Sequence, residues 1–195
     1  MRASGMKGGD FDGTQRGVLN RGIVFVAQGF GSGWIPKGPG TAGTLVGFAW
    51  TWLLMWPGNA VVFWLGACAG VGLAVWICGR AERLLGEHDP GSIVLDEIVA
   101  VPLCFGTLLT AQALGSGFEG PSGFVAGHPW WLGVVLFVGF RFFDIAKPWP
   151  VKQVQALPSG WGVVADDVLA AVWVNVPCLL ALGWVPGCCG DSSAV

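Results

Sequence analysis

Long uncharged apolar segments dominate the pattern of hydrophobic and polar positions along the chain. Residues 60–79 contain no charged side chain, and twenty helical residues at about 1.5 Å each reach roughly 30 Å, the thickness of the hydrocarbon layer of a bilayer. Four further segments show the same pattern less cleanly, at about 42–56, 92–112, 129–147 and 164–185. The pattern predicts an all-α, polytopic helical membrane protein with about five transmembrane or membrane-embedded helices.

These helices are expected to form a single membrane-embedded domain, residues 22–186, between two terminal segments. Residues 1–21 are polar and are expected to form a loose extension. They do not form a cleavable signal peptide, because the apolar run from Ile23 to Ala27 is too short for one. Residues 187–195 form a C-terminal tail, and the glycine-rich segment Gly115–Gly127 is expected to be a flexible loop. The sequence contains no internal repeat.

The charged residues are few and unevenly distributed. Ten Lys and Arg against twelve Asp and Glu leave a net charge of −2, which excludes nucleic acid as a partner because such proteins need a basic surface. With a cytoplasmic N-terminus, all ten basic residues fall on the cytoplasmic side, and the loops near Pro57–Asn59 and Leu114–His128 contain none. The positive-inside rule therefore favours this orientation.

Six acidic residues lie at the cytoplasmic ends of the predicted helices: Asp89, Asp96, Glu97, Asp144, Asp166 and Asp167. Asp96 and Glu97 lie inside an apolar run, and a charge at a helix centre costs about 2.5–3.5 kcal/mol in a membrane. A purely structural role therefore explains this pair poorly. Asp89, followed by Pro90, is a suitable N-cap for the same helix, and Ser92 is an equally suitable one.

Helical periodicity orients the remaining acids. Arg141, Asp144 and Lys147 are three residues apart, which places them on one stripe of a helix. Asp166 and Asp167 are about 100° apart around a helix, so only one of them is expected to point fully into a shared site. Structural roles also fit these residues, because basic residues anchor helices at the cytoplasmic face and acids stabilise helix starts.

Clustered carboxylates at a membrane surface repel one another unless a cation lies between them. Oxygen ligands suit a hard cation, and Mg²⁺ commonly shares its coordination with a substrate phosphate. His88 and His128 are isolated, which gives zinc little support. The segments Gly31–Gly33 and Lys37–Thr44 lead into the first predicted span, where a helix N-terminus and flexible glycines favour an anion. The pattern predicts a site for Mg²⁺ and phosphate, although a plain turn also fits the glycine segment.

The six cysteines form no metal-ligand pattern. Four lie in apolar runs and are expected to be packing residues: Cys68, Cys78, Cys104 and Cys178. The adjacent Cys188 and Cys189 in the tail suit either an intermolecular disulfide or lipidation, and the sequence favours neither.

Three blocks of sequence resemble the phosphatidylglycerophosphatase A family. The first runs from Gly31 to Thr44, the second from His88 to Val99, and the third from Phe140 to Pro150 with a continuation from Gly160 to Asp167. The resemblance implies a largely helical, Mg²⁺-dependent enzyme of the bacterial cytoplasmic membrane. It implies a phospholipid substrate, because the family removes the terminal phosphate from phosphatidylglycerophosphate to give phosphatidylglycerol.

The resemblance also assigns expected roles to individual residues. The family's acidic catalytic positions match Asp89, Asp96, Glu97, Asp144, Asp166 and Asp167. The expected metal ligands are Asp96, Glu97, Asp144, Asp166 and Asp167. The expected phosphate-binding residues are Lys37, Gly40, Thr41, Gly43, Thr44, Arg141 and Lys147. The chain departs from the family in having Ala100 and Ala171 where glycine is expected.

Several alternatives stay open at this point. Direct attack by water and an aspartyl-phosphate intermediate both fit the acids, and Asp89 fits a general acid, a supporting residue or a helix cap. An ion-coupled transporter would also use intramembrane carboxylates, although its acids typically lie near the midplane and its halves often repeat. The sequence favours no particular oligomeric state, number of metal ions or headgroup selectivity.

Overall fold

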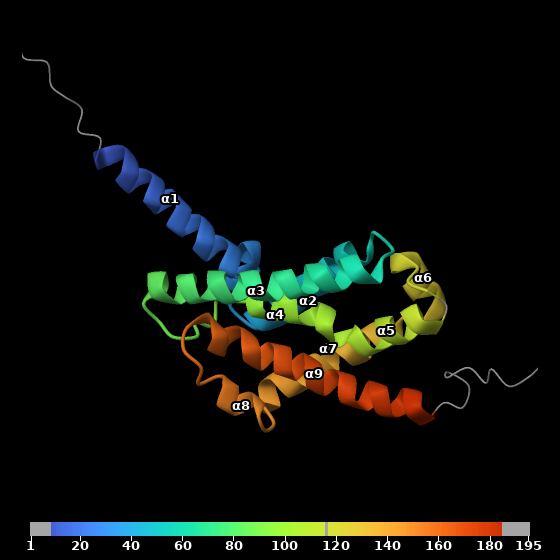
Figure 1. The fold of residues 1–195 in the computed structure, drawn as a ribbon. Helices are drawn as coiled ribbons and strands as arrows, with labels where there is room; N and C mark the ends of the chain where they lie inside the picture. The colour runs from blue at the N-terminus through green and yellow to red at the C-terminus, as the bar shows by residue number, and fades with distance from the viewer. Residues whose placement is uncertain (1–8, 116, 185–195) are drawn as a thin grey trace, which may run out of the picture.

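The computed structural model describes residues 9–115 and 117–184, with side chains described for 17–115 and 117–180. All regular structure in these ranges is helical, and Figure 1 shows an elongated bundle from which α1 projects at one end. The elements are α1 (Gly9–Ala27), η1 (Gly29–Trp34), α2 (Pro39–Met55), α3 (Ala60–Leu85), α4 (Leu95–Cys104), α5 (Gly106–Gly115), α6 (Gly120–Gly127), α7 (Trp131–Ala146), α8 (Val151–Val154) and α9 (Gly160–Trp184).

Three helical segments are long and apolar enough to cross a membrane: α3, the combined α4 and α5 (Leu95–Gly115), and Gly160–Leu180 of α9. The pair α6 and α7, bent by 98°, would supply a fourth. Helix α2 occupies the first predicted span but has 17 residues, fewer than the about 20 that a crossing usually needs. The all-α membrane class is confirmed; within the described residues, three segments, or four with the bent pair, are spans by length and composition, and α2 is too short to be counted with them.

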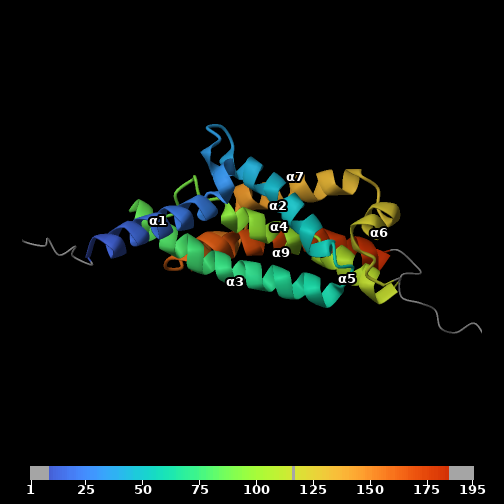
Figure 2. The ribbon, with the colours of Figure 1, turned by 90° about the horizontal axis from the view of Figure 1, so that it is seen from above.

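The central helix α4 packs against α2, α3, α7 and α9, as the two views in Figures 1 and 2 show. Its residues Ala100 and Val101 join Phe63, Phe140 and Ala171 in one buried apolar core. Ala100 and Ala171, the two departures from the expected glycines, are both fully buried. The core therefore accommodates both methyl groups.

The span formed by α4 and α5 is broken near its middle. Pro102 supplies no N–H to the helix, and Asn175 of α9 satisfies the backbone around the break. The Asn175 amide donates to the carbonyl oxygens of Leu103 and Ala171 at 2.8 Å each, and it accepts from the N–H of Thr107 at 2.8 Å. An unpaired backbone group costs several kcal/mol in hydrocarbon, so this one side chain makes the break tolerable in a membrane.

Several helix termini lie at one end of the bundle, where α3 ends. Helix α2 begins at Pro39 and α4 begins at Leu95, while α7 ends at Ala146. Helix α9 begins at Gly160, whose backbone packs directly on Gly79 near the end of α3. A side chain at Gly160 would collide with the α3 backbone, so the absence of one lets α9 start close to the other termini.

Two segments expected to lack structure are helical. Helix α1 includes residues 9–21 of the predicted extension, and its residues Ile23 and Ala27 are buried in a core cluster with Ile77 of α3. Tertiary packing of this kind stabilises helices whose own sequence is unremarkable. Residues Gly120–Gly127 of the expected flexible loop form α6. The tail with Cys188 and Cys189 lies outside the described residues.

Candidate active site

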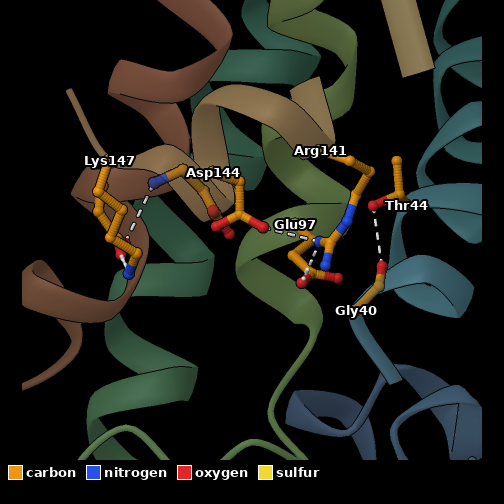
Figure 3. Close-up of polar contacts among 8 residues, drawn as sticks. Gly40, Thr44, Glu97, Arg141, Asp144 and Lys147 are labelled. Atoms are coloured by element: carbon orange, nitrogen blue, oxygen red, sulfur yellow. Dashed lines mark hydrogen bonds and ion pairs between the residues drawn. The ribbon is translucent and has the colours of Figure 1, made fainter. Parts of the chain in front are cut away.

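Arg141 connects two acids from different parts of the chain. Its Nη1 lies 2.8 Å from Glu97 Oε1 of α4 and 2.8 Å from Asp144 Oδ2 one turn further along α7. In Figure 3, dashed lines join the Arg141 guanidinium to the carboxylates of both Asp144 and Glu97. All three side chains are mostly buried, at 13–19% exposed. The predicted stripe on α7 is thus confirmed for Arg141 and Asp144.

Lys147 pairs with the next acid, Asp166 of α9. The helix α7 stops at Ala146, and Lys147 adopts a left-handed backbone with φ of 41°, from which its Nζ donates to Asp166 Oδ2 at 2.7 Å. Burial alone would lower the pKa of Lys147, but the hydrogen bond and charge of Asp166 raise it above its ordinary value. The residue therefore remains cationic at neutral pH.

Asp96, Asp166 and Asp167 are buried at the centre of this cluster, at 7%, 6% and 3% exposed. The backbone N–H of Asp167 donates to Asp166 Oδ1 at 3.1 Å. Asp96 and Glu97 stand in the first turn of α4, Asp166 and Asp167 stand near the start of α9, and these two helices pack together. The acids predicted to gather at one end are therefore gathered, with Arg141 and Lys147 paired to three of them.

Two carboxylate oxygens in the cluster have no partner. Asp96 Oδ1 and Glu97 Oε2 are both buried and make no hydrogen bond in the structure. They lie in the first turn of α4, where the helix dipole favours negative charge. A buried oxygen anion without a partner is costly, so this pair is the part of the site that most needs a further ligand.

A glycine face on α2 brings this helix against the same carboxylates. A Cβ at Gly40 would collide with Glu97 Oε1, and one at Gly43 would lie 2.5 Å from Glu97 Oε2 and 2.8 Å from Val94 Cβ. Gly47 continues the face onto Val101 of α4. The N-terminal turn of α2, with its free N–H groups, is therefore held directly beside Glu97.

The other predicted phosphate-binding residues are placed less centrally. Lys37 and Thr41 are exposed near the start of α2, and no ion pair joins Lys37 to an acid within the described side chains. Thr44 is buried, and its hydroxyl donates to the carbonyl oxygen of Gly40 at 2.8 Å, as Figure 3 shows. Thr44 thus acts within its own helix, while Lys37 and Thr41 remain available to a ligand.

Asp89 does not cap the helix that carries Asp96. Helix α4 begins at Leu95, six residues later, and Asp89 has a left-handed backbone with φ of 51°. Two residues that the sequence analysis did not select hold it: Glu82 of α3 binds its N–H, and Gln155 binds its carboxylate. One signal was available, because an acid in the last turns of a helix opposes the dipole and Glu82 lies three residues before the end of α3.

The donor chemistry of the site fits a hard divalent cation. Within the described residues, no three Asp, Glu, His or Cys side chains converge closely enough to enclose an ion as they stand. However, the donors are all oxygen atoms, as Mg²⁺ prefers, and the two unpaired oxygens of Asp96 and Glu97 adjoin the carboxylates held by the two basic residues.

Comparison with known proteins gives a consistent result. A model of the family described as "Phosphatidylglycerophosphatase A" matches residues 25–182. A Haemophilus influenzae protein of that name is 32% identical over 164 residues, covering 84% of this chain and 90% of the relative. An Escherichia coli protein of the same name is 34% identical over 152 residues, covering 75% and 76%.

A third relative carries a different name. A Bacteroides thetaiotaomicron protein, named provisionally as a phosphatidylinositol-3-phosphatase, is 34% identical over 174 residues, covering 84% of this chain and 95% of the relative. No solved structure matches the chain. The family model covers most of the chain and includes every acid of the cluster. The chain therefore belongs to the phosphatidylglycerophosphatase A family, and it is a phosphatase.

Proposed function

We propose that this chain hydrolyses the terminal phosphate monoester of phosphatidylglycerophosphate, with Mg²⁺ as cofactor, to give phosphatidylglycerol and inorganic phosphate. The observation that carries the proposal is the pair of buried, unpartnered oxygens on Asp96 and Glu97, next to a guanidinium that a phosphate can share. The family and the names of two relatives support this substrate.

The position of the site suits a substrate that stays in the membrane. The acyl chains would remain in lipid, so only the headgroup phosphate has to reach the end of the bundle. Arg141 and Lys147 are the two cations of the cluster, and charge-assisted hydrogen bonds from them would bind phosphate oxygens. The N–H groups at the start of α2 and the exposed Lys37 would add further donors.

The acids would hold the metal ion. Its ligands would come from Asp96, Glu97, Asp144, Asp166 and Asp167. Bound there, Mg²⁺ would supply electrostatic stabilisation of the charge on the transferring phosphoryl group.

Residues of the chain would stabilise the phosphoryl oxygens and protonate the glycerol oxygen as it leaves. In hydrolysis, a water oxygen forms a bond to phosphorus and the water gives up one proton to solvent, while the bond from phosphorus to the glycerol oxygen breaks and that oxygen takes up one proton. Arg141 and Lys147 would stabilise the non-bridging oxygens throughout. Asp89 is an exposed acid whose carboxylate is held by Gln155, which suits it to deliver the proton to the departing oxygen.

We assign the reaction to the cytoplasmic face of a bacterial inner membrane. Arg83, Lys147 and Lys152 lie at the same end of the bundle as the acids, which agrees with the positive-inside rule. The named relatives are bacterial proteins. The gathering of the acids at one end favours a surface reaction over the midplane site of an ion-coupled transporter.

Purified protein in detergent tests the proposal directly. Phosphate release from phosphatidylglycerophosphate is measured with Mg²⁺, with EDTA, and with EDTA followed by excess Mg²⁺. We expect release only when Mg²⁺ is present. Phosphatidylinositol-3-phosphate serves as the competing substrate, because one relative is named for it, and we expect it to be the poorer one. Release in EDTA at the Mg²⁺ rate, or none with any divalent ion, contradicts the proposal.

The close contact of α2 with Glu97 gives a separate prediction. Gly43→Ala adds a methyl group between α2 and α4, which must move apart. Displacing reacting groups by about 1 Å can cost about 10²-fold in rate, so we expect a loss of that order in kcat/KM. Gly72→Ala in α3 is the matched control, because a Cβ there meets no atom within 4 Å. Equal activities for the two variants would contradict the importance of this contact.

A further inference from the structure

Asp89 is the one acid of the predicted set with an unusual backbone. Its φ of 51° lies in the left-handed region, which non-glycine residues rarely occupy unless their surroundings hold them there. It belongs to the connection between α3 and α4 and is exposed. Its carboxylate nevertheless accepts a hydrogen bond from Gln155, the residue on which Gly162, one turn before Asp166 in α9, packs. The chain thus accepts a strained residue at the edge of the carboxylate cluster.

Glu82 holds the main chain of Asp89. Its side chain is only 8% exposed, and its Oε1 accepts from the Asp89 N–H at 3.0 Å and lies 2.9 Å from His88 Nδ1. One buried carboxylate oxygen therefore fixes two successive residues of the connection. A hydrogen bond to a charged acceptor is stronger than a neutral one, which suits it to hold a strained backbone.

Gln155 holds the side chain of the same residue from another element. Its Nε2 donates to Asp89 Oδ2 at 2.9 Å. Gln155 follows α8, which lies beside the start of α9 in Figure 1. A Cβ at Gly162 of α9 would lie 2.6 Å from the Gln155 carbonyl oxygen, so the backbone of α9 packs directly on this residue. Asp89 is thus held by its main chain from α3 and by its side chain from the segment before α9.

We propose that Glu82 is a positioning residue for this reaction, which holds Asp89 where its carboxyl group serves the departing glycerol oxygen, with Gln155 fixing the direction of that group. The inference rests on the proposed function. A positioning role accounts both for the buried acid Glu82 near the end of α3 and for the left-handed backbone of Asp89. A purely structural role for Glu82 would need neither the strain at Asp89 nor the second contact from Gln155.

A double-mutant cycle tests the assignment. We expect Glu82→Ala to lower kcat about 10- to 100-fold, the usual cost of losing a group that orients a functional residue, with KM for phosphatidylglycerophosphate unchanged. Because Glu82 acts through Asp89, adding Glu82→Ala to Asp89→Asn should cause no further loss. Glu82→Gln keeps an oxygen that accepts from the Asp89 N–H and should recover most of the activity. Glu87→Ala, exposed on the same connection, is the control and should match the wild type.

The outcomes separate positioning from folding and from the proposed function. Multiplied losses in the double variant, or a Glu82→Gln variant as impaired as Glu82→Ala, would overturn the positioning role. If Glu82→Ala does not fold, Gln155→Ala replaces it in the same cycle with Asp89→Asn, and multiplied losses in that double variant, or a Glu82→Gln variant that folds but is inactive, would overturn the positioning role. A wild type without activity on this lipid would defeat the proposed function, whereas an active wild type with unaffected Glu82→Ala and Gln155→Ala variants would defeat this inference alone.

Discussion

Asp96→Asn is expected to remove nearly all phosphatase activity while leaving the folded protein at least as stable as the wild type. Asp96 is buried among like charges and has an oxygen without a partner. The amide is nearly the same size and carries no charge, so it relieves repulsion and desolvation in the metal-free protein. The same change removes an anionic ligand, and losing one main electrostatic group from an active site costs about 10²- to 10³-fold in kcat.

Two measurements on the same samples check this result. Phosphate release in saturating Mg²⁺ gives the activity, and thermal unfolding in detergent with EDTA gives the stability. Glu119→Gln is the matched control, because Glu119 is an exposed acid just before α6, away from the cluster, and should change neither quantity. An Asp96→Asn variant with wild-type kcat would remove Asp96 from the catalytic groups. A variant that unfolds much earlier than the wild type would show that Asp96 stabilises the fold instead.

Arg141→Ala is expected to damage both activity and stability. The guanidinium neutralises Glu97 and Asp144, which are only 13% and 15% exposed. Removing one partner of a buried ion pair typically costs about 3–5 kcal/mol, and here two carboxylates lose theirs. Loss of the phosphate contact should add a fall in kcat/KM of about 10³-fold, the upper range for a single group that stabilises a transition state.

The lysine variant separates charge from geometry at this position. Arg141→Lys keeps the charge, but a single ammonium group cannot reproduce the planar fork of the guanidinium. We expect it to restore most of the stability and only about a tenth of the activity. Arg83→Ala provides the comparison, since Arg83 is exposed and its recorded partner is the Ser159 hydroxyl at 3.1 Å. Full activity in Arg141→Ala would exclude Arg141 as a phosphate-binding residue.

The gathering of the acids follows from features that are visible in the sequence. The spacing of Arg141, Asp144 and Lys147 identifies one side of a helix that ends before Pro148, and the structure places cations there against Glu97 and Asp166. Hydrophobic segments identify where the helices run, because a long uncharged segment has few other stable environments. Residue spacing within one helix is a local feature, and the lack of charge in a long segment reflects the membrane environment, so a single sequence is enough to show both.

The contacts that position the acids join residues on different helices, so they cannot be predicted from the sequence of one helix. Glu82 lies between Arg80 and Arg83 and resembles one more charged residue at a membrane surface, so nothing local indicates that it faces Asp89. Neither of the two suggested caps, Asp89 and Ser92, caps this helix, because α4 starts only at Leu95 with Val94 before it. The role of the glycines at 40 and 43 as a surface for Glu97 likewise requires knowing which helix lies opposite.

Asn175 also bears on the order in which the protein is completed during synthesis. The amide group that satisfies the broken span of α4 and α5 belongs to α9, 68 residues after the N–H of Thr107, and the same helix carries Asp166 and Asp167. Until that helix enters the bilayer, the earlier segment exposes unsatisfied peptide groups to lipid. A nascent chain therefore acquires its full acidic cluster only when α9 also satisfies the broken span, so a molecule in which α9 has not inserted lacks both Asp166 and Asp167 at the site and the amide that completes the earlier span.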